Sequence, residues 1–165
     1  MTSQDIVVLA VLMKGNTEQL SYQAISRAAK VSVSEVYASV KRLQECDLLN
    51  SDRNVRKRNA EEFLLHGLRY MFPIKSTGEL VYGIPTSYAA PVSANAFAVS
   101  GNVPVWRSSK GKVLGRYCEP IYPTAPDAAA EDPALYDRLA VIDMLRGGRL
   151  RERKFAEQKI KELMS

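Results

Sequence analysis

Histidine and cysteine are scarce in this chain of 165 residues. It contains one histidine, His66, and two cysteines, Cys46 and Cys118, which lie far apart. No His/Cys group has the spacing of a zinc site, and two distant cysteines do not form a disulfide framework. We therefore predict no metal and no cofactor, and a cytoplasmic protein with reduced thiols. A lone histidine on a helix is usually structural, so His66 is not taken as catalytic.

Motifs of the common enzyme classes are missing as well. The chain has no Ser/His/Asp arrangement, and SKGK (109–112) lacks the glycine spacing and the following Ser or Thr of a phosphate-binding loop. A nuclease site would have to use carboxylates such as Glu61, Glu62 or Glu79, which have no suggestive spacing. We predict no enzymatic activity.

Long hydrophobic runs are also absent. The longest near the N-terminus, residues 6–13, has eight apolar residues, too few to span a bilayer, and Asp5 precedes it instead of a basic segment. The Thr2/Asp5 spacing is that of a capping box and predicts a helix from Ser3 to Lys14 that stops at Gly15, although a strand is an alternative. A helix that is apolar all round must be covered on both sides, by the C-terminal segment or by a second subunit.

Proline is absent from the first 72 residues, and all eight prolines lie between Pro73 and Pro133. This change in composition predicts a boundary near residue 72, with one domain at 1–72 and a second segment at 73–165. Residues 73–125 are rich in Gly, Pro, Ser and Tyr, and one hairpin is predicted there, with strands 103–106 and 113–119 on either side of RSSKGK.

The C-terminal segment, 132–164, is predicted to be helical and to serve packing or dimerisation. Asp132 and Pro133 fit a helix start, and an apolar stripe follows at Leu135, Leu139, Ile142 and Leu145. The last helix carries Leu150, Phe155, Ile160 and Leu163. Arg146, Arg149 and Arg153 are interpreted as a solvated face paired with glutamates, with a second anion-binding patch as the alternative.

Positive charge is concentrated in the first two thirds of the chain. The net charge is +5, and 46% hydrophobic and 25% charged residues are ordinary for a globular protein. Residues 1–58 carry nine Lys or Arg against six Asp or Glu, whereas residues 126–165 carry eight of each. This excess suits a polyanionic partner but is modest.

The most informative stretch is residues 21–49, which predicts two short helices joined by a tight turn. Ser32 and Glu35 have capping-box spacing, and the second helix, 32–45, follows with an apolar stripe at Val33, Val36, Val40 and Leu43. Tyr37, Ala38, Lys41 and Arg42 lie on its opposite side. Ser21 is placed to cap a first helix whose inner side carries Ile25, Ala28 and Ala29.

This arrangement resembles the helix-turn-helix of bacterial winged-helix regulators, the broad group that includes the multiple-antibiotic-resistance repressor type. The resemblance covers residues 1–72. Ile25 and Ala29 match the packed positions of its first helix, Val36 and Val40 match buried positions of its recognition helix, and 48–49 match the strand that leads into the wing. The usual turn glycines are replaced by Lys30 and Asp47.

The resemblance implies an N-terminal winged helix-turn-helix within a mainly α fold with a small β component. Residues 50–58 fall at the position of the wing, with a solvated basic loop as the alternative, and Asn59 and Glu62 are predicted to open a further helix that Pro73 ends. That helix carries an apolar stripe: Phe63, Leu64, Gly67, Leu68 and Met71.

The function implied is sequence-specific binding of double-stranded DNA by a transcriptional regulator, as a homodimer without membrane association and with an unidentified small-molecule effector as an option. Phosphate contacts would come from Lys14, Lys30, Arg53, Arg56, Lys57 and Arg58, and major-groove contacts from Ser34, Tyr37, Ala38, Lys41 and Arg42. The alternative is a protein–protein interaction module on the same scaffold, such as a toxin–antitoxin or assembly component.

Overall fold

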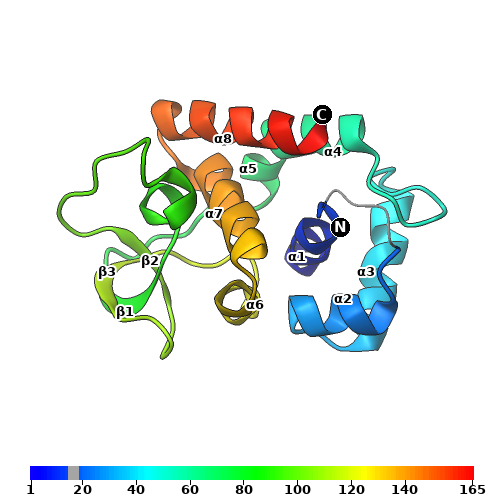
Figure 1. Cartoon of the computed structure of the whole chain (residues 1–165), viewed down its shortest axis with the longest axis horizontal. Coiled ribbons are helices and arrows are strands. Elements are labelled where there is room, and N and C mark those ends of the chain that lie inside the picture. The colour runs from blue at the N-terminus through cyan, green and yellow to red at the C-terminus, as the bar shows by residue number, and fades with distance from the viewer. Residues whose placement is uncertain (15–18) are drawn as a thin grey trace.

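The computed structural model describes residues 1–14 and 19–165 and is mainly helical with one small three-stranded sheet, which confirms the predicted mainly α composition with a small β component (Figure 1). The helices are α1 (Ser3–Leu12), α2 (Tyr22–Ala29), α3 (Val33–Glu45), α4 (Lys57–His66), α5 (Leu68–Met71), α6 (Ala125–Glu131), α7 (Pro133–Gly147) and α8 (Leu150–Met164). The strands are β1 (Leu80–Pro85), β2 (Pro104–Arg107) and β3 (Val113–Tyr117), and two short 3-10 turns, η1 (Ser87–Ala89) and η2 (Pro91–Ser93), follow β1.

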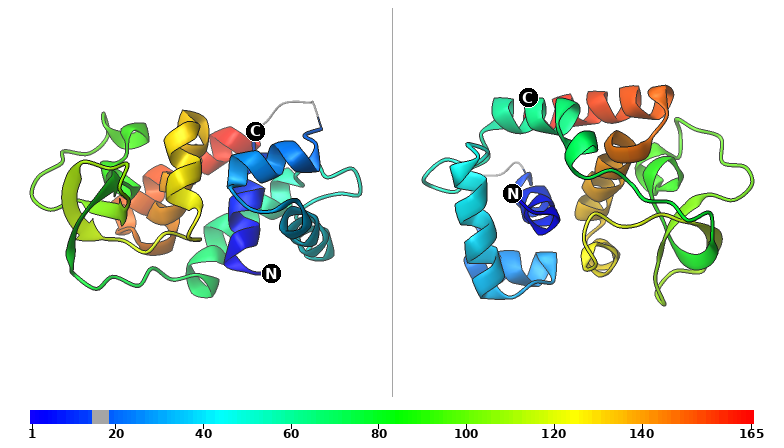
Figure 2. Two further views of the ribbon diagram at one scale, coloured as in Figure 1. Left: turned by 90° about the horizontal axis from the view of Figure 1, so that it is seen from below. Right: turned by 180° about the vertical axis from the view of Figure 1, so that it is seen from behind.

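Helix α1 lies at the centre of the molecule, with α2 and α3 on one side and α7 on the other (Figures 1 and 2). The predicted capping box of Thr2 and Asp5 is present, and Ile6–Ala10 are completely buried. The cover that an all-apolar helix requires is therefore supplied by α7 of the same chain. The predicted stop at Gly15 lies outside the described residues.

One apolar core joins the two segments predicted from composition, since it contains Ile6 and Leu43 of the first together with Leu135 and Ile142 of the second. The predicted stripe of α7 is buried, and the Asp132 carboxylate caps α7 by accepting hydrogen bonds from two backbone N–H groups. Helix α8 then packs on α7 and α4. Leu150, the first residue of α8, is 60% exposed, whereas Ile160 of the same helix is completely buried.

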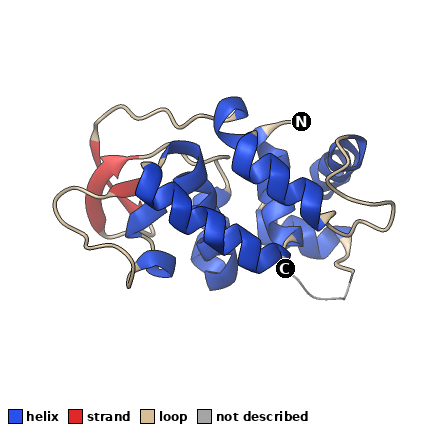
Figure 3. Ribbon diagram, turned by 90° about the horizontal axis from the view of Figure 1, so that it is seen from above, coloured by secondary structure: helices blue, strands red, loops and turns tan. Residues whose placement is uncertain are grey.

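The three strands form a small closed barrel at one end of the molecule (Figure 3). Both predicted strands exist, but the predicted hairpin between them does not form. Strand β1 pairs antiparallel with β2 and with β3, and β2 and β3 are therefore parallel. Closure requires close backbone approach: a Cβ on Gly83 would lie 1.7 Å from the Trp106 carbonyl oxygen, and a Cβ on Gly115 would lie 2.2 Å from the Val103 oxygen. Glycines at these positions permit a barrel that side chains would block.

The helix predicted after residue 58 begins earlier and is broken. Helix α4 starts at Lys57, and Asn59 donates a side-chain hydrogen bond to the Asp47 carbonyl instead of capping the helix. Gly67 separates α4 from the single turn of α5, which ends before Pro73 as predicted. In the predicted stripe Leu64 and Leu68 are buried, Phe63 and Gly67 are half-buried, and Met71 is exposed.

A buried polar network holds the barrel against α7. The Asp143 carboxylate accepts hydrogen bonds from the Thr86 hydroxyl at 2.7 Å and from the Trp106 indole N–H at 2.8 Å, and it pairs with the Arg146 guanidinium at 2.7 Å. Arg146 also donates to the carbonyl oxygens of Phe72 and Glu119. It therefore belongs neither to a solvated face nor to an exposed anion-binding patch. Burial raises the pKa of Asp143, and the Arg146 guanidinium opposes that shift.

Within residues 1–14 and 19–165, no helix combines the length and the apolar character that crossing a membrane requires.

Candidate nucleic-acid interface

The turn between α2 and α3 is tight and left-handed. Lys30 adopts φ 58° and ψ 40° after the last residue of α2, and its backbone N–H donates to the Ser26 carbonyl. Asp47, the other residue that stands where glycine is usual, has φ 63°. A left-handed conformation costs a side-chain-bearing residue about 1 kcal/mol relative to glycine. Both turns keep their tight geometry despite that cost.

Capping fixes where α3 begins. The Ser32 hydroxyl accepts a hydrogen bond from the Glu35 N–H at 3.2 Å, and the Glu35 carboxylate accepts one from the Ser32 N–H at 2.9 Å. The backbone and hydroxyl donors of Ser32 lower the pKa of Glu35. Glu35 is thus the capping residue that its spacing predicts.

The inner side of α3 follows most of the predicted stripe. Val36, Val40 and Leu43 are buried against α1 and α2, whereas Val33 is 42% exposed. Val33 is the first residue of the helix. The side of α3 that faces away from α1 and α2 is partly available to solvent.

That outer face carries three exposed side chains that differ in chemistry: Ser34, Tyr37 and Lys41. Tyr37 is 60% exposed and packs one side of its ring on Tyr22 of α2, with ring centroids 5.7 Å apart. Ala38, on the same side of α3, is half-buried. Among the described residues, the Lys41 ammonium has no carboxylate within ion-pair distance.

Arg42 has a different environment from its neighbour Lys41. Its Nη2 lies 2.7 Å from Asp5 Oδ1, its Nε donates to both carboxylate oxygens, and it also bonds to the Ser39 hydroxyl. The Asp5 side chain is fully buried, and its negative charge is paired with the Arg42 guanidinium. The guanidinium expected to read base edges is therefore engaged in binding α3 to α1.

Two opposing influences act on Asp5. Burial alone would raise the pKa of the Asp5 carboxyl, but hydrogen bonds from Arg42, from the Thr2 backbone and from Ser39 outweigh burial and lower the pKa. Asp5 is therefore ionised throughout the neutral range. In turn the hydrogen bond with Asp5 raises the pKa of Arg42.

The segment expected to form a wing is a compact loop with a single antiparallel bridge between Leu49 and Val55. The Asn50 side-chain oxygen accepts from the N–H groups of Asp52 and Asn54, which closes the loop. Arg53 does not extend outward. Its guanidinium lies 4.5 Å from the Tyr22 ring centroid and donates to the Leu20 carbonyl.

The other basic residues predicted to contact phosphates are divided between paired and unpaired groups. Lys30 forms an ion pair with Glu131 of α6, and Arg56 lies 3.3 Å from Asp47. Lys57 donates to the Ser165 carbonyl. Lys14 and Arg58 are exposed, and neither has a carboxylate partner among the described residues.

Two contacts tie the turn before α3 to the second half of the chain. The Lys30–Glu131 ion pair is one, and the other is a 2.8 Å hydrogen bond from the Thr124 hydroxyl to the Ala29 carbonyl. Both join the end of α2 to α6 and the residue before it. The sequence analysis did not predict α6, whose seven residues are mostly alanine.

No family model, no curated protein sequence and no solved structure matches this chain.

Proposed function

We propose that the chain is a winged helix-turn-helix protein that binds double-stranded DNA by inserting α3 into the major groove, and that it acts as a cytoplasmic transcriptional regulator. The observation that carries the proposal is the outer face of α3. There Lys41, Tyr37 and Ser34 are exposed on a helix whose other side, cap and preceding turn are all fixed by the fold. A rigid helix with a free cation and hydrogen-bonding side chains matches the requirements for direct readout of base edges.

The geometry narrows the set of DNA contacts. Arg42 forms an ion pair with Asp5, and Arg53 contacts the Tyr22 ring and donates to the Leu20 carbonyl. Neither arginine is therefore assigned to DNA. Lys41 is the principal candidate for a guanine O6/N7 contact, and Arg58 is a candidate for phosphate. One such helix reads few base pairs, so binding as a homodimer to paired half-sites is part of the proposal. Helix α1 is covered by its own chain and is not a dimer surface.

Lys41→Ala is expected to weaken binding to the preferred duplex about tenfold, the lower range for loss of one good base contact. The preferred duplex is first selected from a pool of randomised DNA with the wild-type chain, and affinity is then measured by fluorescence anisotropy at several salt concentrations. Lys112→Ala is the matched control. It removes the same charge from an exposed residue directly before β3, a strand of the barrel, which lies at the other end of the molecule from α3.

The salt dependence provides a separate check. Binding through phosphates must weaken as salt rises, because counterions are released from the DNA. Failure to enrich any duplex, combined with retention on heparin that salt does not reduce, would contradict DNA binding.

A protein–protein interaction module is the second candidate function, and the exposed face of the barrel favours it. Leu80 and Tyr82 on β1 and Leu114 on β3 are 49%, 64% and 46% exposed, and Tyr82 and Leu114 are cross-strand partners. If this module were the main function, Tyr82→Ser would abolish capture of a partner while leaving heparin retention unchanged.

A further inference from the structure

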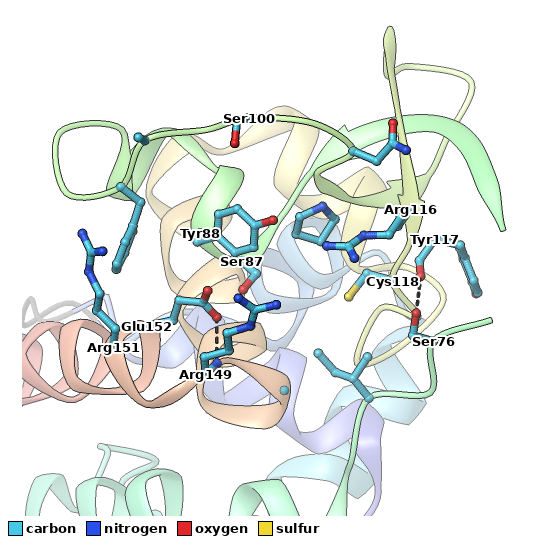
Figure 4. A pocket seen from close by; sticks show the side chains of 16 residues that line it. Ser76, Ser87, Tyr88, Ser100, Arg116, Tyr117, Cys118, Arg149, Arg151 and Glu152 are labelled. Carbon is cyan, nitrogen blue, oxygen red and sulfur yellow. Dashed lines mark hydrogen bonds between the residues drawn. The ribbon is translucent and has the colours of Figure 1, made fainter. Parts of the chain in front are cut away.

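A pocket of about 730 Å³ lies between the barrel, the loop that precedes β2, and the start of α8 (Figure 4). Ligand sites for small organic molecules commonly enclose about 300–1,000 Å³. The barrel and the start of α8, which line the pocket, lie on one side of α7, whereas α3 lies on the far side of α1 (Figure 1). Any ligand held there is therefore distinct from DNA bound by α3.

Positive charge dominates the pocket. Its lining includes three arginines, Arg116, Arg149 and Arg151, and a single carboxylate, Glu152. The Glu152 carboxylate is engaged because it accepts a 2.8 Å hydrogen bond from the Arg149 backbone N–H at the start of α8. Excess guanidinium groups around one space repel one another unless an anion lies between them.

The three arginines are not equivalent. Arg151 lies over the Phe97 ring at 5.3 Å and reaches the Ala96 carbonyl, so it holds the loop that borders the pocket. Arg116 and Arg149 have no carboxylate partner among the described residues. Figure 4 shows their guanidinium groups extending from opposite sides of the pocket toward its middle.

Ser87 supplies a hydroxyl on the inner wall. The residue is 6% exposed, and its hydroxyl makes no hydrogen bond to another described residue. Its backbone has φ 54°, a left-handed conformation that costs a serine about 1 kcal/mol or more. The neighbouring Thr86–Asp143 hydrogen bond fixes the chain beside this strained residue. The Ser87 hydroxyl thus lines the pocket without a partner among the described residues, and together with the Arg116 and Arg149 guanidinium groups in the same lining it forms a donor set.

Phosphate is the anion that this donor set fits best. Guanidinium groups bind phosphate oxygens with two parallel hydrogen bonds, and a serine hydroxyl adds a further donor. A phosphate ion fills only a small part of 730 Å³, which leaves room for an organic group beside the half-buried Tyr88 ring. Cys118 also lines the pocket, but burial raises the pKa of its thiol, so it is a neutral wall and not a nucleophile.

We propose that this pocket binds a small phosphate monoester, with Arg116, Arg149 and Ser87 on the phosphate and Tyr88 beside the organic group. The proposal is independent of DNA binding by α3. It assigns to the second half of the chain a binding site for a phosphorylated small molecule.

The test is calorimetric titration of the full chain with adenosine monophosphate, glucose 6-phosphate, inorganic phosphate and adenosine. At least one phosphate ester is expected to bind at least about tenfold more tightly than inorganic phosphate and adenosine. Arg116→Ala and Arg149→Ala are each expected to weaken that binding about tenfold, the loss typical of a charge-assisted phosphate contact. Ser87→Ala is expected to weaken it less, because a neutral donor is lost.

Arg27→Ala is the matched control, since Arg27 is exposed on α2 and does not line the pocket. Binding of the ester by Arg27→Ala must equal that of the wild type. Absence of binding by both esters at 1 mM (on the order of the weakest affinities of biological interest), or ester binding that survives loss of both Arg116 and Arg149, overturns the proposal. Equal affinity for the ester and for inorganic phosphate overturns the assignment of an organic ligand. Circular dichroism of each variant confirms that a loss of binding is not a loss of folding.

Discussion

Asp143→Ala is expected to lower the free energy of unfolding by about 3–5 kcal/mol, the cost of breaking a buried ion pair by removing one partner. The substitution leaves the Arg146 guanidinium buried with its carboxylate gone, and it removes the acceptor of the Thr86 hydroxyl and of the Trp106 indole. Urea denaturation followed by circular dichroism measures the loss. Trp106 is the only tryptophan, so its fluorescence reports the state of the barrel in the same experiment.

Asp127→Ala is the control for this prediction. Asp127 also forms an ion pair, with Lys110 at 3.3 Å, but both side chains are at least half exposed. Such surface pairs contribute about 0–1 kcal/mol to stability. Replacing Arg146 with Met in the Asp143→Ala background should recover part of the lost stability, because the unpaired buried charge is then removed. If the free energy of unfolding of Asp143→Ala were within about 1 kcal/mol of the wild-type value, the network would not hold the barrel to α7.

Features of the fold that depend on near neighbours in sequence were predictable. The capping boxes of Thr2/Asp5 and Ser32/Glu35 and the stripe of α7 each involve residues three or four apart, where helical geometry alone decides the contact. Local chemistry is visible in a single sequence because its partners are a fixed number of residues apart.

Contacts between distant residues were not predictable in the same way. In the barrel, β1 is the antiparallel partner of both β2 and β3. The predicted hairpin would instead have paired β2 and β3 with each other. Asp143 and Arg146 are separated by one helical turn, so their proximity was readable, but their burial depends on Thr86 and Trp106. An acidic residue within an otherwise apolar stretch indicates that a cation lies nearby in the folded chain, but it does not identify that cation.

Two neighbouring basic residues of the candidate DNA interface have different roles in the folded chain. Lys41 and Arg42 are adjacent in the sequence and have the same charge, so composition and motif position treat them alike. The fold separates them, because Arg42 lies at the edge of α3 that faces Asp5 of α1, whereas Lys41 faces solvent. Only the tertiary contact distinguishes a residue that stabilises the helix pair from one that is available to DNA.

Arg42→Ala is accordingly expected to lower the free energy of unfolding by about 2–3 kcal/mol, since it leaves a buried carboxylate without its charged hydrogen-bond donor. This expected loss is smaller than the loss for a fully buried ion pair because the Arg42 side chain is 30% exposed. Lys41→Ala should change stability by less than about 0.5 kcal/mol, as for other surface substitutions. At low temperature, where both variants are folded, Arg42→Ala should keep wild-type DNA affinity within about twofold, whereas Lys41→Ala loses about tenfold.

The pH dependence of stability supplies the decisive measurement for this pair. The folded pKa of Asp5 is lowered below its unfolded value, so the stabilisation is fully present above about pH 4 and is lost as pH falls through the folded pKa. Asp5→Asn removes this titration and should flatten the acid side of the stability curve relative to the wild type. In the Arg42→Ala background Asp5→Asn should be less harmful than in the wild type, because a neutral amide needs no cation. Equal effects of Asp5→Asn in the two backgrounds would mean that Asp5 and Arg42 do not act together, and Arg42 would again be a candidate for DNA contact.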